Sequence, residues 1–169
     1  MKPLAEQLAF YQSYHRTLAC KATHFIGVPL VTFSILIPMG WLSVPAFGHR
    51  PTLAMAFVGI TLVYYFTLQP VLATLMTVAM IPVTYAAAWV SKLPFKESLE
   101  VFAVSFIFGW VFQLLGHAIE GKRPALLDNF GAVFTAPLFL LVEVLIAWGW
   151  KGLPKREISL PKREKGLPK

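Results

Sequence analysis

The sequence has 169 residues, of which 57% are hydrophobic and only 14% are charged, whereas an ordinary soluble domain is about 25% charged. Residues 51–91 contain no charged side chain, and this length is sufficient for two membrane passes of about 20 residues each. The composition therefore excludes a soluble globular protein and predicts an all-α, polytopic membrane protein.

The net charge of +7 gathers near the two ends of the chain, where it suits anionic lipid headgroups. The basic residues are not interleaved with stacking aromatic residues, so nucleic-acid binding is not predicted. The first twenty residues lack a basic start followed by an apolar run, and no cleavable signal peptide is expected. The single cysteine, Cys20, excludes an internal disulfide.

In chain order, residues 3–22 predict an interfacial amphipathic helix, because Leu4, Leu8, Tyr11 and Leu18 form an approximate helical stripe. Four or five transmembrane helices follow in a single membrane domain, residues 1–150, with spans over about 25–44, 52–69, 71–90, 101–119 and 131–150. The final segment, 151–169, repeats LPKRE and GLPK. We expect a basic, disordered tail there, with headgroup binding as the alternative.

Four spans separate His24 from His117, and an even number of passes returns the chain to its starting side. His15, His24 and His117 are therefore expected at one membrane face, and His49 at the other. Basic residues around those three histidines favour the cytoplasmic side. A fifth complete pass would put the basic tail outside, so either 131–150 is re-entrant or broken at Pro137, or an earlier segment does not cross.

The three histidines at one face are candidates for a metal site, because neutral imidazole is a common ligand for iron and zinc. His15 and His24 are nine residues apart and lie on opposite sides of a straight helix, so a shared metal requires a bend within Arg16–Thr23. Gln113, His117 and Glu120 share one helix face and could hold a ligand with its supporting partners. The alternative is interfacial histidines that make ordinary hydrogen bonds.

Other polar residues have competing interpretations. Lys21, Lys122 and Arg123 lie near the same face and could bind the carboxylate of a lipid-like substrate, or they reflect the positive-inside rule. Tyr11 and Tyr14 could be aromatic-belt anchors. Cys20 is expected to pack as a small residue, with a thiolate ligand as the alternative.

Glu143 lies within an apolar segment, where an acidic side chain is a functional candidate. Its depth of about 18 Å from the helix start argues against direct metal binding at the surface. We expect it to be a partner for polar groups on another span.

Two segments resemble a known family of small multipass membrane proteins, the 2-hydroxy fatty acid dioxygenases of fatty acid α-oxidation, typified by a yeast endoplasmic-reticulum enzyme. They are FYQSYHRTLACKATHFIGVP and GWVFQLLGHAIEGKRPALLDN, and Ala136, Pro137 and Glu143 resemble the segment that follows. Family members often have asparagine at the position of Cys20. They also carry a further histidine without a counterpart here.

The resemblance implies an iron(II)-dependent enzyme that uses O2 to remove one carbon from a 2-hydroxy fatty acid. It implies Fe2+ bound by His15, His24 and His117, which would be the catalytic residues. The residues expected around these ligands are Tyr11, Gln113, Glu120, Asp128 and Asn129, and the carboxylate would be positioned by Lys21, Lys122 or Arg123.

The rival interpretation is a non-enzymatic lipid-binding or small-solute membrane protein whose histidines serve structure or pH sensing. A zinc-dependent lipid hydrolase is a lesser rival. Short loops and the lack of an obvious retrieval signal favour a bacterial inner membrane over the endoplasmic reticulum.

Overall fold

The computed structural model describes residues 3–43 and 51–150, and within these ranges the chain is helical with no named strand. The elements are α1 (Leu4–Tyr14), α2 (Leu18–Trp41), α3 (Leu53–Leu68), α4 (Pro70–Val90), α5 (Phe95–Glu120), the 3-10 helix η1 (Ala125–Leu127) and α6 (Ala132–Ala147). The predicted all-α fold is confirmed. His49 and the tail 151–169 lie outside the described residues.

Three of the described helices, α2, α4 and α5, are long and apolar enough to cross a membrane, whereas α3 and α6 are shorter apolar helices of 16 residues each. Only 11% of the apolar window of α5 is buried within the protein. Its exposed side chains include Ile107, Phe108 and Val111. Such a surface suits contact with lipid, because the transfer of apolar side chains from water to an apolar environment is favourable. The architecture is that of a polytopic membrane protein.

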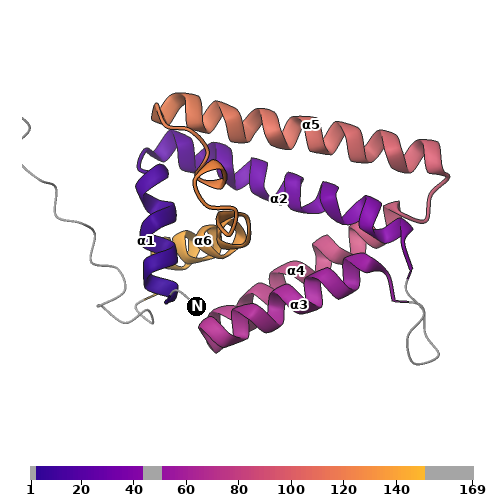
Figure 1. Ribbon diagram of the computed structural model, residues 1–169, viewed down its shortest axis with the longest axis horizontal. Helices are drawn as coiled ribbons and strands as arrows, with labels where there is room; N and C mark the ends of the chain where they lie inside the picture. Colours follow the sequence, from indigo (N-terminus) through magenta and orange to yellow (C-terminus); the bar gives the residue numbers. More distant parts are fainter. Residues whose placement is uncertain (1–2, 44–50, 151–169) are drawn as a thin grey trace, which may run out of the picture.

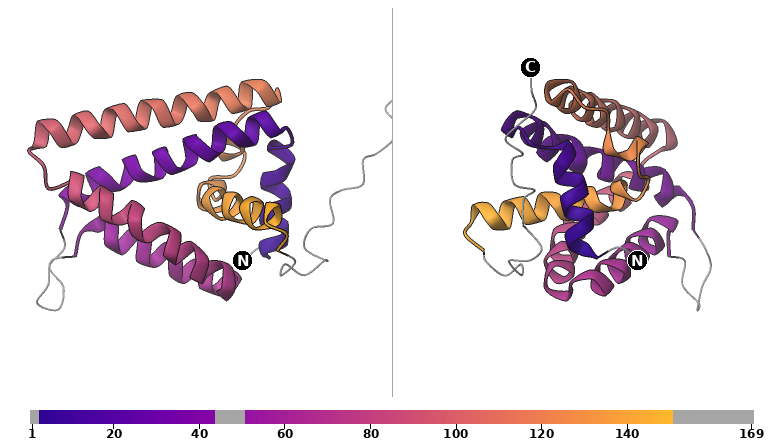
Figure 2. Two further views of the ribbon diagram at one scale, coloured as in Figure 1. Left: turned by 180° about the vertical axis from the view of Figure 1, so that it is seen from behind. Right: turned by 60° about the vertical axis from the view of Figure 1, so that its left-hand side comes forward.

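Helices α2 and α5 lie side by side and antiparallel, and α3 and α4 form a second antiparallel pair (Figure 1). The two pairs meet near the loop that joins α4 to α5 and diverge toward the opposite end. There, α1 and α6 lie between them, and α6 runs across the direction of α2 and α5 (Figures 1 and 2). The ends of α1, α2 and α5 that carry the predicted histidines are consequently neighbours.

Glycines allow α2 and α5 to approach closely. A Cβ atom on Gly27 would lie 3.0 Å from the carbonyl oxygen of Gly109, and one on Gly109 would lie 2.8 Å from the Val31 side chain. Small residues at a helix interface are the usual way for membrane helices to gain packing contacts. This contact sets the register between His24 on α2 and His117 on α5.

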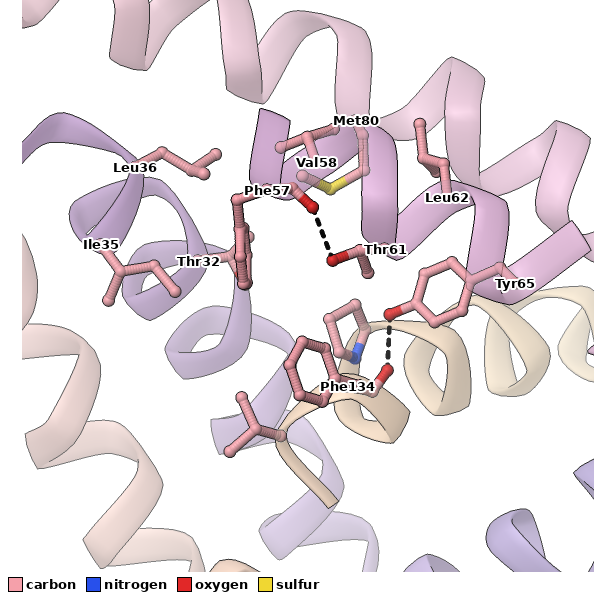
Figure 3. Close-up of a pocket in the computed structure, with 12 residues that line it drawn as sticks. Thr32, Ile35, Leu36, Phe57, Val58, Thr61, Leu62, Tyr65, Met80 and Phe134 are labelled. Carbon is pink, nitrogen blue, oxygen red and sulfur yellow. Dashed lines mark hydrogen bonds between the residues drawn. The ribbon is translucent and has the colours of Figure 1, made fainter. Parts of the chain in front are cut away.

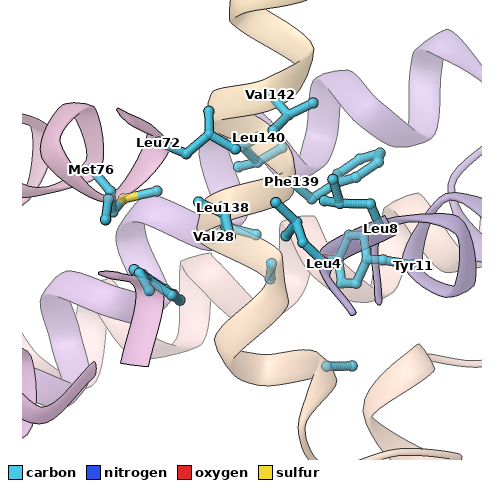
Figure 4. Packing of buried hydrophobic residues seen from close by; sticks show 14 of the residues in the cluster. Leu4, Leu8, Tyr11, Val28, Leu72, Met76, Leu138, Phe139, Leu140 and Val142 are labelled. Carbon is cyan, nitrogen blue, oxygen red and sulfur yellow. The ribbon is translucent and has the colours of Figure 1, made fainter. Parts of the chain in front are cut away.

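A core of apolar side chains joins α1 and α6 to the rest of the protein (Figure 4). Leu4, Leu8 and Tyr11 on α1 pack in one buried cluster with Leu138 and Phe139 on α6. Leu72 and Met76 on α4 belong to the same cluster. Three of the four residues of the predicted stripe therefore face α6, because burial against protein removes these side chains from water. The fourth, Leu18, begins α2 and is 84% exposed.

The continuous helix expected over 3–22 is wrong in one respect: α1 ends at Tyr14 and α2 begins at Leu18. Thr17 has extended backbone, and its hydroxyl accepts a hydrogen bond from the Cys20 amide at 3.2 Å. This N-cap begins a new helix. The break overlaps the Arg16–Thr23 stretch where a bend was expected, and the first two turns of α2 include Cys20, Lys21 and His24.

Candidate metal centre

The three predicted histidines meet at the junction of α1, α2 and α5. His15 follows the last residue of α1, His24 lies in the second turn of α2, and His117 lies in the last turn of α5. Their ring centroids are 4.3 Å apart for His15 and His24, 5.0 Å for His15 and His117, and 4.9 Å for His24 and His117. All three are buried, with at most 7% of each residue exposed.

Glu120 holds the bend that brings His15 to His24. Its carboxylate accepts hydrogen bonds from the Arg16 amide at 3.0 Å, the Thr17 amide at 2.9 Å and the Thr17 hydroxyl at 2.7 Å. Amide groups at a helix start lack partners within the helix, and a carboxylate there is also favoured by the helix dipole. The last residue of α5 thus fixes the α1–α2 junction.

Hydrogen bonds to backbone carbonyls determine the tautomers of His15 and His24. His15 Nδ1 lies 2.8 Å from the Tyr11 carbonyl oxygen, and His24 Nδ1 lies 2.9 Å from the Cys20 carbonyl oxygen. Since a carbonyl only accepts, both Nδ1 atoms carry the proton and both Nε2 atoms present a lone pair. The two Nε2 atoms are 3.0 Å apart. Lone pairs at this distance repel each other unless a cation lies close to both.

A metal ion satisfies this pair better than a proton does. Burial lowers the pKa of His15 to about 3, although the hydrogen bond to Tyr11 opposes part of this shift. The ring is therefore neutral at physiological pH. Ligand nitrogens at about 2.1 Å from a metal and about 90° from each other lie about 3 Å apart. Metal-binding histidines also commonly donate their other N–H group to a backbone carbonyl.

His117 lies beside these two rings and has one nitrogen without a partner in the described part of the chain. Its Nδ1 atom is buried without a hydrogen-bond partner among the described residues, and leaving such a group unpaired costs about 1–3 kcal/mol. A metal or a bound substrate would supply the missing partner. The facing nitrogens of His15 and His24 thus fit a metal-binding role, with His117 beside them but outside the group of ligand atoms that lie within 4.8 Å of one another. Neutral nitrogen ligands of this kind suit iron, zinc, copper or nickel.

Cys20 also lies beside the histidines, and ligand atoms of His15, Cys20 and His24 fall within 4.8 Å of one another. However, the Cys20 sulfur is 3.8 Å from His24 Nδ1, the nitrogen that already donates to the backbone. The thiol therefore flanks the outer edge of the His24 ring. The pair of facing Nε2 atoms remains the better description of the centre.

A cavity of about 310 Å³ extends from the histidines into the protein. Tyr11, His15 and His117 line its near end, and most of the other lining residues are apolar. Gln113 and Trp110 also line it, one and two helical turns from His117 along α5. The Trp110 Nε1 atom is buried and unpaired among the described residues. A long apolar ligand with a polar end fits this cavity, since its polar end would face the histidines.

The three cations expected to bind a carboxylate each contact a protein group. Lys21 pairs with Glu143 on α6 at 2.8 Å, so Glu143 has the partner on another helix that was expected for it. Lys122 donates to the Ser13 carbonyl at 2.8 Å, and Arg123 pairs with Asp128. None of these three cations is among the residues that line the cavity at the histidines.

The remaining predicted residues support the site in different ways. Tyr11 stacks on the His15 ring with centroids 4.1 Å apart. Asp128 accepts hydrogen bonds from Tyr14 and Arg123, and the Asn129 side chain accepts one from the Gly131 amide at 3.0 Å. Sequence reasoning missed Trp110, although it follows the spacing of Gln113 and His117 along one helix face.

Comparisons with known proteins agree with this arrangement. Residues 1–147 match the family described as 2-hydroxy-palmitic acid dioxygenase Mpo1-like. The chain is 31% identical over 163 residues to 2-hydroxy-palmitic acid dioxygenase MPO1 of Saccharomyces cerevisiae, an alignment that covers 93% of this chain and 87% of the yeast protein. No solved structure matches the chain. The matching segment includes the whole histidine cluster and its cavity, and the chain belongs to the Mpo1-like family.

Proposed function

We propose that this protein is an iron(II)-dependent dioxygenase that removes one carbon from 2-hydroxy fatty acids. The reaction balances without an external reductant. Cleavage of the bond between the carboxyl carbon and the hydroxyl-bearing carbon releases CO2 and four electrons, and these electrons reduce one O2. The products are a fatty acid shortened by one carbon, CO2 and water.

The observation that supports this proposal is the pair of facing Nε2 atoms beside a long apolar cavity. The histidines alone would suit several metals. Similarity to a dioxygenase favours iron and O2 over zinc, and the cavity favours an acyl chain over a small polar solute.

In the proposed mechanism, His15, His24 and His117 would hold the iron. Iron(II) bound there would supply the one-electron chemistry that O2 requires. The carbonyls of Tyr11 and Cys20 keep the two imidazoles in the binding tautomer. The apolar walls exclude water and orient the acyl chain so that the hydroxyl and carboxylate face the histidines.

Lys122 and Arg123 have a role before this step. Both are exposed and lie at the same end of the helices as the histidines. We propose that they attract the carboxylate of the acid to this face of the membrane, whereas Lys21 stabilises the contact between α2 and α6 through Glu143.

Metal analysis of the purified protein after anaerobic iron(II) loading tests the proposal. We expect about one iron per chain for one three-histidine centre, and loss of that iron in His24→Ala and His117→Ala at retained helical content. Oxygen uptake with 2-hydroxypalmitate should then follow iron occupancy. A wild-type protein that binds no iron would overturn the dioxygenase proposal, and unchanged metal content in both variants would favour a non-enzymatic lipid-binding protein. Turnover without O2 would instead indicate a zinc hydrolase.

A further inference from the structure

A second apolar cavity lies directly behind the one that contacts the histidines. It has a volume of about 50 Å³ and lies between α2, α3, α4 and α6 (Figure 3). The two cavities share three lining residues, Thr32 and Ile35 on α2 and Val133 on α6. These three side chains, which we call the dividing wall, contact both spaces and separate them.

The order of residues along α2 places the two cavities in line with the metal centre. His24 comes first, Val28 and Val31 line only the larger cavity, Ile35 lines both, and Leu36 lines only the smaller one. From His24 to Ile35, α2 advances about 16 Å at about 1.5 Å per residue. One leaflet of a bilayer core is about 15 Å thick, half of about 30 Å, and a membrane-lipid acyl chain spans one leaflet. The far end of such a chain would reach the dividing wall.

The smaller cavity has the chemistry of a site for a terminal hydrocarbon. Phe57, Val58 and Met80 line it, and in Figure 3 Val58 and Met80 lie above Thr61 while the Phe57 ring lies to its left. The Thr61 hydroxyl donates to the Phe57 carbonyl, and the Tyr65 hydroxyl donates to the Phe134 carbonyl. These two hydroxyl groups already have hydrogen-bond acceptors, so neither requires a polar ligand in the cavity.

We propose that the dividing wall sets the maximum acyl-chain length that the protein accepts, and that the smaller cavity can take the end of a longer chain when the wall is opened. This inference rests on the proposed function for the identity of the acyl chain. It assigns Thr32, Ile35 and Val133 a role in specificity without placing them near the reacting atoms.

The test measures binding apart from turnover. Wild-type protein in lipid nanodiscs, kept anaerobic, binds a fluorescent fatty acid probe, and 2-hydroxylaurate, 2-hydroxypalmitate and 2-hydroxyarachidate compete for it. Ile35→Ala and Val133→Ala open the dividing wall from two different helices. If one variant fails to fold, the other still tests the proposal. Ile26→Ala is the matched control, because it makes the same truncation on the exposed face of α2.

Each methylene group that moves into apolar surroundings improves affinity about fourfold. Two additional methylene groups in the smaller cavity would therefore raise affinity for the longest acid, relative to 2-hydroxypalmitate, about fifteenfold. We expect this change in both wall variants and none in Ile26→Ala. An unchanged ratio in well-folded wall variants would overturn the inference, as would failure of every 2-hydroxy acid to displace the probe. Length-dependent displacement of the probe without oxygen uptake would support the role of the dividing wall and would contradict only the dioxygenase proposal.

Discussion

At the scale of single residues, backbone carbonyls fix the tautomers of the two facing imidazoles. The carbonyl that each Nδ1 contacts belongs to the residue four positions earlier, Tyr11 for His15 and Cys20 for His24. A spacing of four returns to the same helix face, so the ring of His15, which directly follows α1, and the ring of His24 within α2 both lie back over the preceding helical turn. The tautomer of each ring is thus a consequence of helix geometry, which requires no special residue at Tyr11 or Cys20.

Gly116 makes room for the same rings. A Cβ atom at this position would lie 2.3 Å from the Thr23 hydroxyl oxygen and 2.8 Å from His24 Nδ1. We expect Gly116→Ala to displace the His24 ring and weaken metal binding about 10–100-fold, as other changes to residues that support metal ligands do. Anaerobic iron titration of the purified protein measures this effect.

Gly59→Ala is the matched control for this prediction. Nothing lies within 4 Å of a Cβ atom at Gly59, which is in the interior of α3. Alanine is favoured over glycine within a helix by about 0.5–1 kcal/mol, so this variant should keep its metal affinity and unfold at the same temperature or higher. Equal metal affinities in the two variants would contradict the role of Gly116.

At the scale of elements, the α1–α2 junction depends on a side chain more than 100 positions away along the chain. The carboxylate of Glu120 accepts three hydrogen bonds from Arg16 and Thr17. We expect Glu120→Ala to lower the unfolding free energy by only about 1 kcal/mol, because water can replace partners at an exposed junction. Its larger effect should be on the relative position of His15 and His24, and hence on iron affinity.

Two measurements separate these effects of Glu120. Thermal unfolding in detergent reports stability, and iron titration reports the geometry of the histidines. Glu100→Ala removes an exposed carboxylate from the opposite part of α5 and should change neither. Wild-type iron affinity in Glu120→Ala would mean that the junction holds its shape without this carboxylate.

The bend between His15 and His24 was predictable from sequence, but the contacts between helices that hold it were not. Nine positions between His15 and His24 require a change of direction if both are to reach one ion. The ion pair of Lys21 with Glu143 joins residues 122 positions apart on α2 and α6, so it depends on how the helices pack. Each cavity combines residues from at least three helices, and the dividing wall combines residues from α2 and α6, so no local pattern reveals them.

At the scale of the whole molecule, both α1 and α6 lie at the end where α2 begins and α5 ends (Figures 1 and 2). The chain runs away from this end along α2, returns along α3, leaves along α4 and returns along α5 (Figure 1). These four traverses agree with the expected gathering of His15, His24 and His117 at one end, and three of the four helices, α2, α4 and α5, are long and apolar enough to cross a membrane. Helix α6 runs across α2 and α5 (Figures 1 and 2), and this orientation favours a last segment that stays at the same face as the histidines. A re-entrant segment 131–150 was one of the two ways to keep the basic tail on the cytoplasmic side.

Labelling of introduced cysteines tests this topology, because the one natural cysteine, Cys20, is fully buried. Lys92→Cys lies in the exposed loop between α4 and α5, Leu127→Cys follows α5, and Trp148→Cys follows α6. Leu127 and Trp148 are 69% and 83% exposed, so a membrane-impermeant maleimide can reach both positions. We expect these two to be labelled from one side of sealed vesicles and Lys92→Cys from the other. If α6 crossed the membrane, Trp148→Cys would be labelled together with Lys92→Cys, and the positive-inside rule would then be violated by the seven basic residues of 151–169.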